Sequence, residues 1–269
     1  MKNPIFGFIG CGNMGGALAT AARKALPGEN ILLANRTPGK AAALAEKLGA
    51  RAVDNAAAAK ESDYLFLGVK PHLAAGVLAE LAPVLARRAA PPVLVSMAAG
   101  VTTGQLSAWA GPEVPVIRIM PNTPVAVGQG VVLYSKNEKV TPDLEEGFRA
   151  VMAKAGGLFP IDEAIIDAGT AVSGCGPAFA YLMLDAMADG GVACGLPRGD
   201  AVQFAAQTLM GAAQMVLETG KHPAQLKNEV CSPGGSTIQG VRMLEQRGVP
   251  AALMDAVIVS YEKSAALGK

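Results

Sequence analysis

The chain has 269 residues, 51% hydrophobic and 17% charged, which is enough for a sizeable core and two domains. A net charge of +1 without a basic run, together with only 4% aromatic residues, argues against nucleic-acid or membrane binding. The four cysteines are widely separated and there are only two histidines, so we predict a reduced, cytoplasmic protein without a bound metal.

The chain begins with an apolar strand, residues 5–9, followed at once by the glycine-rich turn 10–15 (GCGNMG) and a helical stretch, residues 17–26. In this context the first glycine permits a tight turn, the second lets the backbone approach a pyrophosphate, and the third lets helix and strand pack closely. The unpaired N–H groups at the helix start favour a phosphate. Without that context a glycine-rich stretch is more often only a loop; with it, the turn predicts dinucleotide binding.

The second strand, residues 31–34, is followed by the turn NRTPGK, with Asn35 first. No acid stands where an NAD-specific unit usually binds the ribose 2′-hydroxyl. Arg36 can instead bind a 2′-phosphate, and Thr37 and Lys40 can add contacts; alternatively, Arg36 and Lys40 are simply solvated. We therefore predict that NADPH is preferred and that NADH is an alternative coenzyme.

Strand-like and helical stretches alternate through the rest of the first half, which predicts a Rossmann-type doubly wound, largely parallel sheet. The further strands are expected at residues 64–69, 93–96, 114–120, 131–134 and 158–161, with helices at 41–48, 73–86 and 144–155. After Asp162 only helices are expected, at 177–192, 197–218, 223–230, 237–246 and 250–267. The predicted domains are therefore 1–162, which binds the dinucleotide, and 163–269, which is all-helical.

Two of the later helical stretches, 178–184 and 204–216, are apolar on nearly every face. Such helices must be buried, and one small bundle offers few buried positions. We therefore expect a homodimer formed through the second domain, with a compact monomeric bundle as the alternative. The longest uncharged stretch, 89–112, contains prolines, glycines and hydroxyl residues and is not expected to span a membrane.

Several segments that follow strands are candidates for chemistry. Lys70 can approach a coenzyme phosphate or remain solvated, and His72 is more simply a loop histidine. The small residues of 97–100 would let a nicotinamide lie close to the backbone. Asn122 can orient the coenzyme amide or cap a turn.

The loop 232–237, SPGGST, opens a predicted helix. Its glycines and small residues leave N–H groups free to bind a carboxylate, and the Thr237 hydroxyl can bond a substrate nitrogen. The alternative is an ordinary helix-capping loop, because Ser and Gly are common at that position.

Taken together, these motifs resemble the pyrroline-5-carboxylate reductase family over essentially the whole chain. The motifs are GFIGCGNMG at 7–15, VKPH at 69–72, MPNTP at 120–124, VSGCGPA at 172–178 and SPGGST at 232–237, the most specific of them. The resemblance implies reduction of 1-pyrroline-5-carboxylate to L-proline by NAD(P)H, the last step of proline synthesis. It also implies a dimer through the helical domain, in some members assembled into a decamer.

The resemblance also implies site residues. Coenzyme contacts would come from Ile9, Gly10, Cys11, Gly12, Asn13, Met14, Asn35, Arg36, Thr37, Asn55, Val69, Lys70, Pro71, His72, Met97, Ala98 and Ala99. The substrate carboxylate would meet the amides of Gly235, Ser236 and Thr237 within the loop that also holds Ser232 and Gly234, and Thr237 would be the catalytic residue. Glu163 aligns with an acid near the substrate. Cys175, where Ser is common, and Asn228, one position early, depart from the family pattern.

Two rival functions are a β-hydroxyacid dehydrogenase and a non-catalytic NADPH-binding regulator. The β-hydroxyacid dehydrogenases carry a GxGxxxK pattern whose lysine assists at the hydroxyl. In this chain the pattern would begin at Gly174, but Ala180 stands at the position of the lysine. The second would not need a substrate-binding loop.

Overall fold

The computed structural model describes residues 4–267, and the chain divides into two compact units. The first comprises Met1–Cys175 and Ser260–Lys269, and the second comprises Gly176–Val259.

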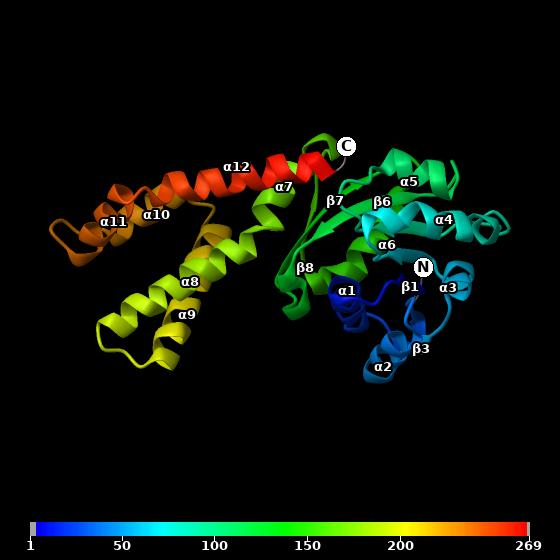
Figure 1. The fold of residues 1–269 in the computed structure, drawn as a ribbon, viewed down its shortest axis with the longest axis horizontal. Helices are drawn as coiled ribbons and strands as arrows, with labels where there is room; N and C mark the ends of the chain where they lie inside the picture. Colours follow the sequence, from blue (N-terminus) through cyan, green and yellow to red (C-terminus); the bar gives the residue numbers. More distant parts are fainter. Residues whose placement is uncertain (1–3, 268–269) are drawn as a thin grey trace. The chain divides into compact units, whose positions relative to one another are not determined.

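An eight-stranded sheet forms the centre of the first unit (Figure 1). Its strands are β1 (Phe6–Ile9), β2 (Ile31–Ala34), β3 (Arg51–Ala52), β4 (Tyr64–Leu67), β5 (Val93–Ser96), β6 (Val116–Pro121), β7 (Gly130–Lys136) and β8 (Gly156–Pro160). Their order across the sheet is β3-β2-β1-β4-β5-β6-β7-β8, and all neighbours are parallel except β6 and β7. The predicted doubly wound, largely parallel sheet is confirmed.

Seven α-helices connect or follow these strands. They are α1 (Asn13–Arg23), α2 (Pro38–Leu48), α3 (Asn55–Glu61), α4 (Pro71–Leu85), α5 (Thr103–Ala110), α6 (Pro142–Met152) and α7 (Ile166–Ser173). Helix α1 begins four residues earlier than predicted, so the second half of the glycine-rich turn is already helical. The short elements β3, α3 and α7 lie outside the predicted strands and helices.

Strand residues alternate between two apolar layers. Phe6 stacks on Tyr64 with ring centroids 4.6 Å apart, and Phe8 stacks on Phe66 at 4.5 Å, on the face that α1, α2 and α6 cover. Leu65 and the other residues of opposite parity face α3, α4 and α5. This period of two explains why the strands are apolar throughout: both faces of the sheet are buried.

The antiparallel pairing of β6 and β7 follows from their connection. Only residues 122–129 join them, including the 3₁₀ turn Thr123–Val127. A parallel pair needs a crossover of a dozen or more residues, so this chain must turn back on itself.

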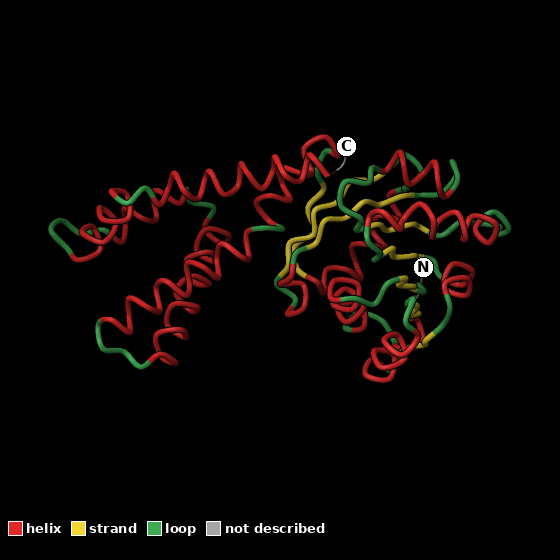
Figure 2. The backbone as a smooth tube through the Cα atoms, in the orientation of Figure 1, coloured by secondary structure: helices red, strands yellow, loops and turns green. Residues whose placement is uncertain are grey.

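The second unit is helical, as Figure 2 shows in red. It contains α8 (Gly176–Ala193), α9 (Arg198–Thr219), α10 (Pro223–Val230), α11 (Ser236–Gln246) and most of α12 (Val249–Leu267). The five predicted helices are therefore present. Helices α8 and α9 pack against each other, joined by the short turn 194–197.

Large apolar side chains of this unit are exposed in the single chain. Leu182 is 73% exposed, Phe204 56% and Leu217 82%. By length and composition the helical segment Glu163–Ala193 could cross a membrane. Within its most apolar stretch of 18 residues, 11% is buried inside the protein. An exposed apolar surface of this kind marks either a protein interface or a membrane contact.

Candidate active site

A cleft of about 460 Å³ opens at the carboxyl ends of β1 and β4. The sheet order reverses between these strands, and ligands of open α/β sheets bind at such a point. The cleft is lined by Gly12, Asn13, Met14, Gly15, Gly68, Val69, Lys70, Pro71, Met97, Ala99, Met120 and Pro121. The structure thus brings three sequence motifs, far apart in the chain, to one cavity.

A different physical constraint favours glycine at each of the three glycine positions of the turn. Gly10 adopts φ +100, which disfavours any residue with a side chain. A Cβ on Gly15 would lie 2.1 Å from the Gly10 carbonyl oxygen, so only glycine lets α1 approach β1 this closely. A Cβ on Gly12 would meet nothing within 4 Å, because that glycine faces open space at the cleft.

The first turn of α1 carries the anion-binding groups. Gly12 is the N-cap and supplies no side-chain cap, so the N–H groups of Asn13, Met14 and Gly15 have no acceptor within the helix. A pyrophosphate would satisfy them and would lie at the positive end of the helix dipole. The residues present therefore fit a dinucleotide.

A second cavity of about 740 Å³ lies beyond the tip of β2. Asn35 and Arg36 line it, together with Asn55 at the start of α3. Asp54 lines it too, but one of its carboxylate oxygens accepts the Ala57 N–H at 2.7 Å and caps α3. The cavity has the composition expected for the adenosine end of NADPH, with a cation and no free acid at the strand tip.

Six predicted coenzyme residues line neither cavity: Ile9, Gly10, Cys11, Thr37, His72 and Ala98. His72 is exposed on the first turn of α4, and Ala98 is only 1% exposed and packs in the apolar layer under α4 and α5. Their contact with the coenzyme stays a prediction.

Asn122 has a structural role. Its amide nitrogen donates to the Ser173 carbonyl at 2.8 Å, and its amide oxygen accepts the Val131 N–H at 2.8 Å. The predicted alternative of a turn cap is wrong for this side chain, which makes no cap bond to the turn Thr123–Val127. Asn122 instead holds the β6–β7 connection to the end of α7.

Glu163 lies in a network that sequence reasoning missed. Its carboxylate accepts the N–H of Thr103 at 2.8 Å and the Thr103 hydroxyl at 2.7 Å, and it pairs with Arg118 at 3.2 Å. Arg118 is only 3% exposed and also pairs with Asp167 at 3.2 Å. The available signal was an arginine inside an otherwise apolar strand, since a buried cation needs carboxylate partners. Substrate contact by Glu163 stays a prediction.

The loop 232–237 lies in the helical unit and has an unusual backbone. Gly234 adopts φ +71, and the Gly235 N–H donates to the Ser232 carbonyl at 3.0 Å. Gly235 is the N-cap of α11 without a side-chain cap, so the N–H groups of Ser236 and Thr237 have no acceptor in the helix. Both residues are exposed, which leaves these donors open to a carboxylate.

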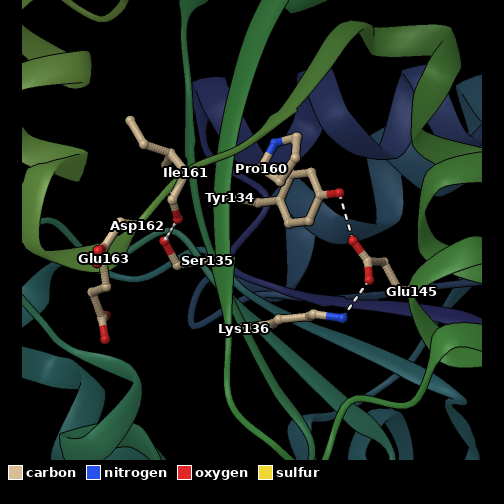
Figure 3. Close-up of a pocket in the computed structure, with 8 residues that line it drawn as sticks. All are labelled: Tyr134, Ser135, Lys136, Glu145, Pro160, Ile161, Asp162 and Glu163. Atoms are coloured by element: carbon tan, nitrogen blue, oxygen red, sulfur yellow. Dashed lines mark hydrogen bonds and ion pairs between the residues drawn. The ribbon is translucent and has the colours of Figure 1, made fainter.

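Another cavity, of about 480 Å³, lies beside β7 and β8 (Figure 3). The Tyr134 hydroxyl donates to Glu145 at 2.7 Å, and Lys136 pairs with the same carboxylate. Glu163, a predicted substrate residue, also lines this cavity, but its carboxylate bonds Thr103 and Arg118. The bonds from Lys136 and Tyr134 lower the pKa of Glu145, whereas burial raises the pKa of Tyr134. None of the predicted coenzyme residues lines this cavity, and we interpret the cluster as a clasp between β7 and α6.

The comparisons with known proteins agree with this geometry. The pyrroline-5-carboxylate reductase of Escherichia coli (strain K12) is 42% identical over 267 residues, which cover 98% of each protein. This chain belongs to the pyrroline-5-carboxylate reductase family.

Two solved structures and two family models extend the match. The Plasmodium falciparum pyrroline carboxylate reductase with NADP bound is 32% identical, with a TM-score of 0.88 and 100% of both chains covered. The Coxiella burnetii pyrroline-5-carboxylate reductase is 31% identical, with a TM-score of 0.90 and 99% of both chains covered. Residues 163–267 match the model described as pyrroline-5-carboxylate reductase dimerisation, and residues 5–100 match that described as NADP oxidoreductase coenzyme F420-dependent.

We predict that Gly12→Ala weakens coenzyme binding without unfolding the chain. Gly12 has φ −76, which alanine adopts freely, but the new methyl would occupy the cleft. The Kd for NADPH, measured by calorimetry, should rise about tenfold or more. As a control, Gly76→Ala, on the exposed face of α4 with nothing near its Cβ, should leave the Kd unchanged. Equal Kd values for both variants would contradict the assignment.

A second prediction concerns the thiol in the glycine-rich turn. Burial raises the pKa of Cys11 to about 11, well above the ordinary value of a thiol. Since the thiolate is the reactive form, the folded protein at pH 8 should alkylate at Cys11 roughly 100-fold more slowly than an ordinary thiol. The rate should increase as the pH rises toward 11. Mass spectrometry after iodoacetamide treatment measures it, and equal rates in buffer and in urea would show the prediction to be wrong.

Proposed function

We propose that this chain reduces 1-pyrroline-5-carboxylate to L-proline, the last step of proline biosynthesis, with NADPH as the preferred coenzyme and NADH as an alternative. Family membership supports the reaction. The structural observation that carries the proposal is the chemistry of the coenzyme cleft: among the described residues that line it, Lys70 is the one titratable group.

The scarcity of acids suits an imine. Reduction of a carbonyl produces an alkoxide, so the enzyme must supply a proton donor. A cyclic imine is protonated in solution and accepts hydride without a strong enzymic acid. Met97 and Met120 give the cleft two apolar walls.

When bound, NADPH supplies a hydride from C4 of its nicotinamide to the imine carbon. We propose that the N–H groups of Ser236 and Thr237, together with that of Gly235, bind the substrate carboxylate, with Ser232 and Gly234 shaping the loop. The Gly235 N–H also donates to the Ser232 carbonyl, so its bond to the carboxylate would be shared. The Thr237 hydroxyl holds the iminium proton at the ring nitrogen, and Glu163 lies near the substrate.

We propose that the turn 9–14, of which Gly12, Asn13 and Met14 line the cleft, binds the pyrophosphate. Asn35, Arg36 and Asn55, which line the second cavity, bind the adenosine end together with Thr37. Residues 69–72 and 97–99 bind the nicotinamide end.

We also propose a functional division at residue 162, with coenzyme binding by 1–162 and substrate binding and dimerisation by 163–269. The family match for dimerisation begins at residue 163. The protein is proposed to be cytoplasmic, which suits four free cysteines.

The reaction and the role of Thr237 are tested together by following NADPH absorbance with the cyclic imine. Wild-type protein should oxidise NADPH and form L-proline. Thr237→Ala should lower kcat/KM by roughly ten- to a thousand-fold through loss of positioning. Thr237→Ser keeps the hydroxyl and should retain most activity. An unchanged value in Thr237→Ala removes this residue from the mechanism, and an inactive wild type removes the function.

The oligomeric state is tested by sedimentation equilibrium. The exposed apolar surface of α8 and α9 predicts a homodimer at least, and a decamer would be built from such dimers. The expected mass is an even multiple of 27.3 kDa. A mass equal to one chain would refute the dimer.

A further inference from the structure

Asn35 joins the two loops that flank the coenzyme site. Its side-chain oxygen accepts the Cys11 N–H at 3.1 Å, and its side-chain nitrogen donates to the Thr37 carbonyl at 3.1 Å. A main-chain N–H can only donate and a carbonyl can only accept, so these partners fix the orientation of the amide. Each end of the Asn35 side chain therefore has a specific partner.

Other bonds complete this link between the glycine-rich turn and the tip of β2. The Ala34 carbonyl accepts the Gly10 N–H at 2.8 Å and the Cys11 thiol at 3.4 Å. The segment that carries Arg36 is consequently held to the pyrophosphate-binding turn before any ligand binds, which lowers the ordering cost of binding.

We propose that Asn35 sets the coenzyme preference, because its bridging amide positions the Arg36–Thr37 turn for a 2′-phosphate. The inference rests on the proposed function only in assuming a nicotinamide dinucleotide as coenzyme. An aspartate at this position accepts from Cys11 but cannot donate to the Thr37 carbonyl, and its charge repels a phosphate. The side-chain nitrogen of Asn35, which an aspartate replaces with a charged oxygen, thus separates a preference for NADPH from a preference for NADH.

The cavity offers one rival determinant. Asp54 also lines it, on the side of α3, with one carboxylate oxygen used as the cap of that helix. If Asp54 controlled the preference by repelling the 2′-phosphate, neutralising it would raise the affinity for that group. Asparagine is an equally good N-cap, so Asp54→Asn tests the charge without removing the cap.

The test measures binding of 2′,5′-ADP and 5′-AMP by calorimetry to the full chain. These probes differ only in the 2′-phosphate. In Asn35→Asp the affinity for 2′,5′-ADP should fall about tenfold or more, while that for 5′-AMP changes less than about threefold. Asn35→Ala, which loses the bridge without adding charge, should lower 2′,5′-ADP affinity about three- to tenfold. Asp54→Asn should alter the ratio of the two affinities less than about twofold.

The inference would be overturned if the ratio of the affinities for 2′,5′-ADP and 5′-AMP were unchanged in both Asn35 variants, or if both affinities fell equally. It would also be overturned if Asp54→Asn changed that ratio more than the Asn35 variants do. Asn35→Ala keeps the test decisive if the aspartate variant fails to fold. Neither probe can be oxidised or reduced, so the result does not depend on turnover. A protein that discriminates the probes but leaves the cyclic imine unreduced would retain this inference and lose the proposed reaction.

Discussion

The close approach of three glycines at the carboxyl ends of β1 and β4 is the constraint on which the coenzyme site depends. A Cβ on Gly10 would lie 2.3 Å from the Gly68 carbonyl oxygen, and a Cβ on Gly15 or Gly68 would lie 2.1 or 2.8 Å from that of Gly10. Because these positions have no side chains, α1 begins directly above β1 with its N–H groups facing the cleft. The cleft, its anion-binding end and the adjoining link through Asn35 all follow from this contact.

The local parts of this arrangement could be predicted from sequence. Strand, glycine-rich turn and helix are consecutive, and their spacing alone indicates a Rossmann-type unit. The apolar strands likewise have both faces buried, which explains their continuous hydrophobic runs. Elements with a short or conflicting sequence pattern could not be predicted. Strand β3 has only two residues, which is too few to show a strand pattern. Helix α1 starts inside the glycine-rich turn, where the glycines have a low helix propensity.

Long-range side-chain pairings explain most of what sequence reasoning could not find. The pairing of Arg118 with Glu163 and Asp167 joins residues about 45 to 49 positions apart, and no local pattern connects them. Asn122 was expected to orient the coenzyme amide or cap a turn, and neither alternative predicts its distant partners Ser173 and Val131. By contrast, the loop 232–237 was found correctly as a helix start, because its glycines and small residues have a local backbone signature.

Two chemical features, each in its own unit, support one reaction. Among the described residues that line the coenzyme cleft, Lys70 is the one titratable proton donor. The start of α11 offers N–H groups without an acceptor in the helix, and they can bind a carboxylate. A cyclic imine that bears a carboxylate needs both features. The most direct test is a crystal structure with NADP⁺ and proline bound. The account predicts the proline carboxylate on the amides of Gly235–Thr237, with the ring carbon against nicotinamide C4. A carboxylate bound elsewhere, with this loop in solvent and remote from the coenzyme, would contradict it.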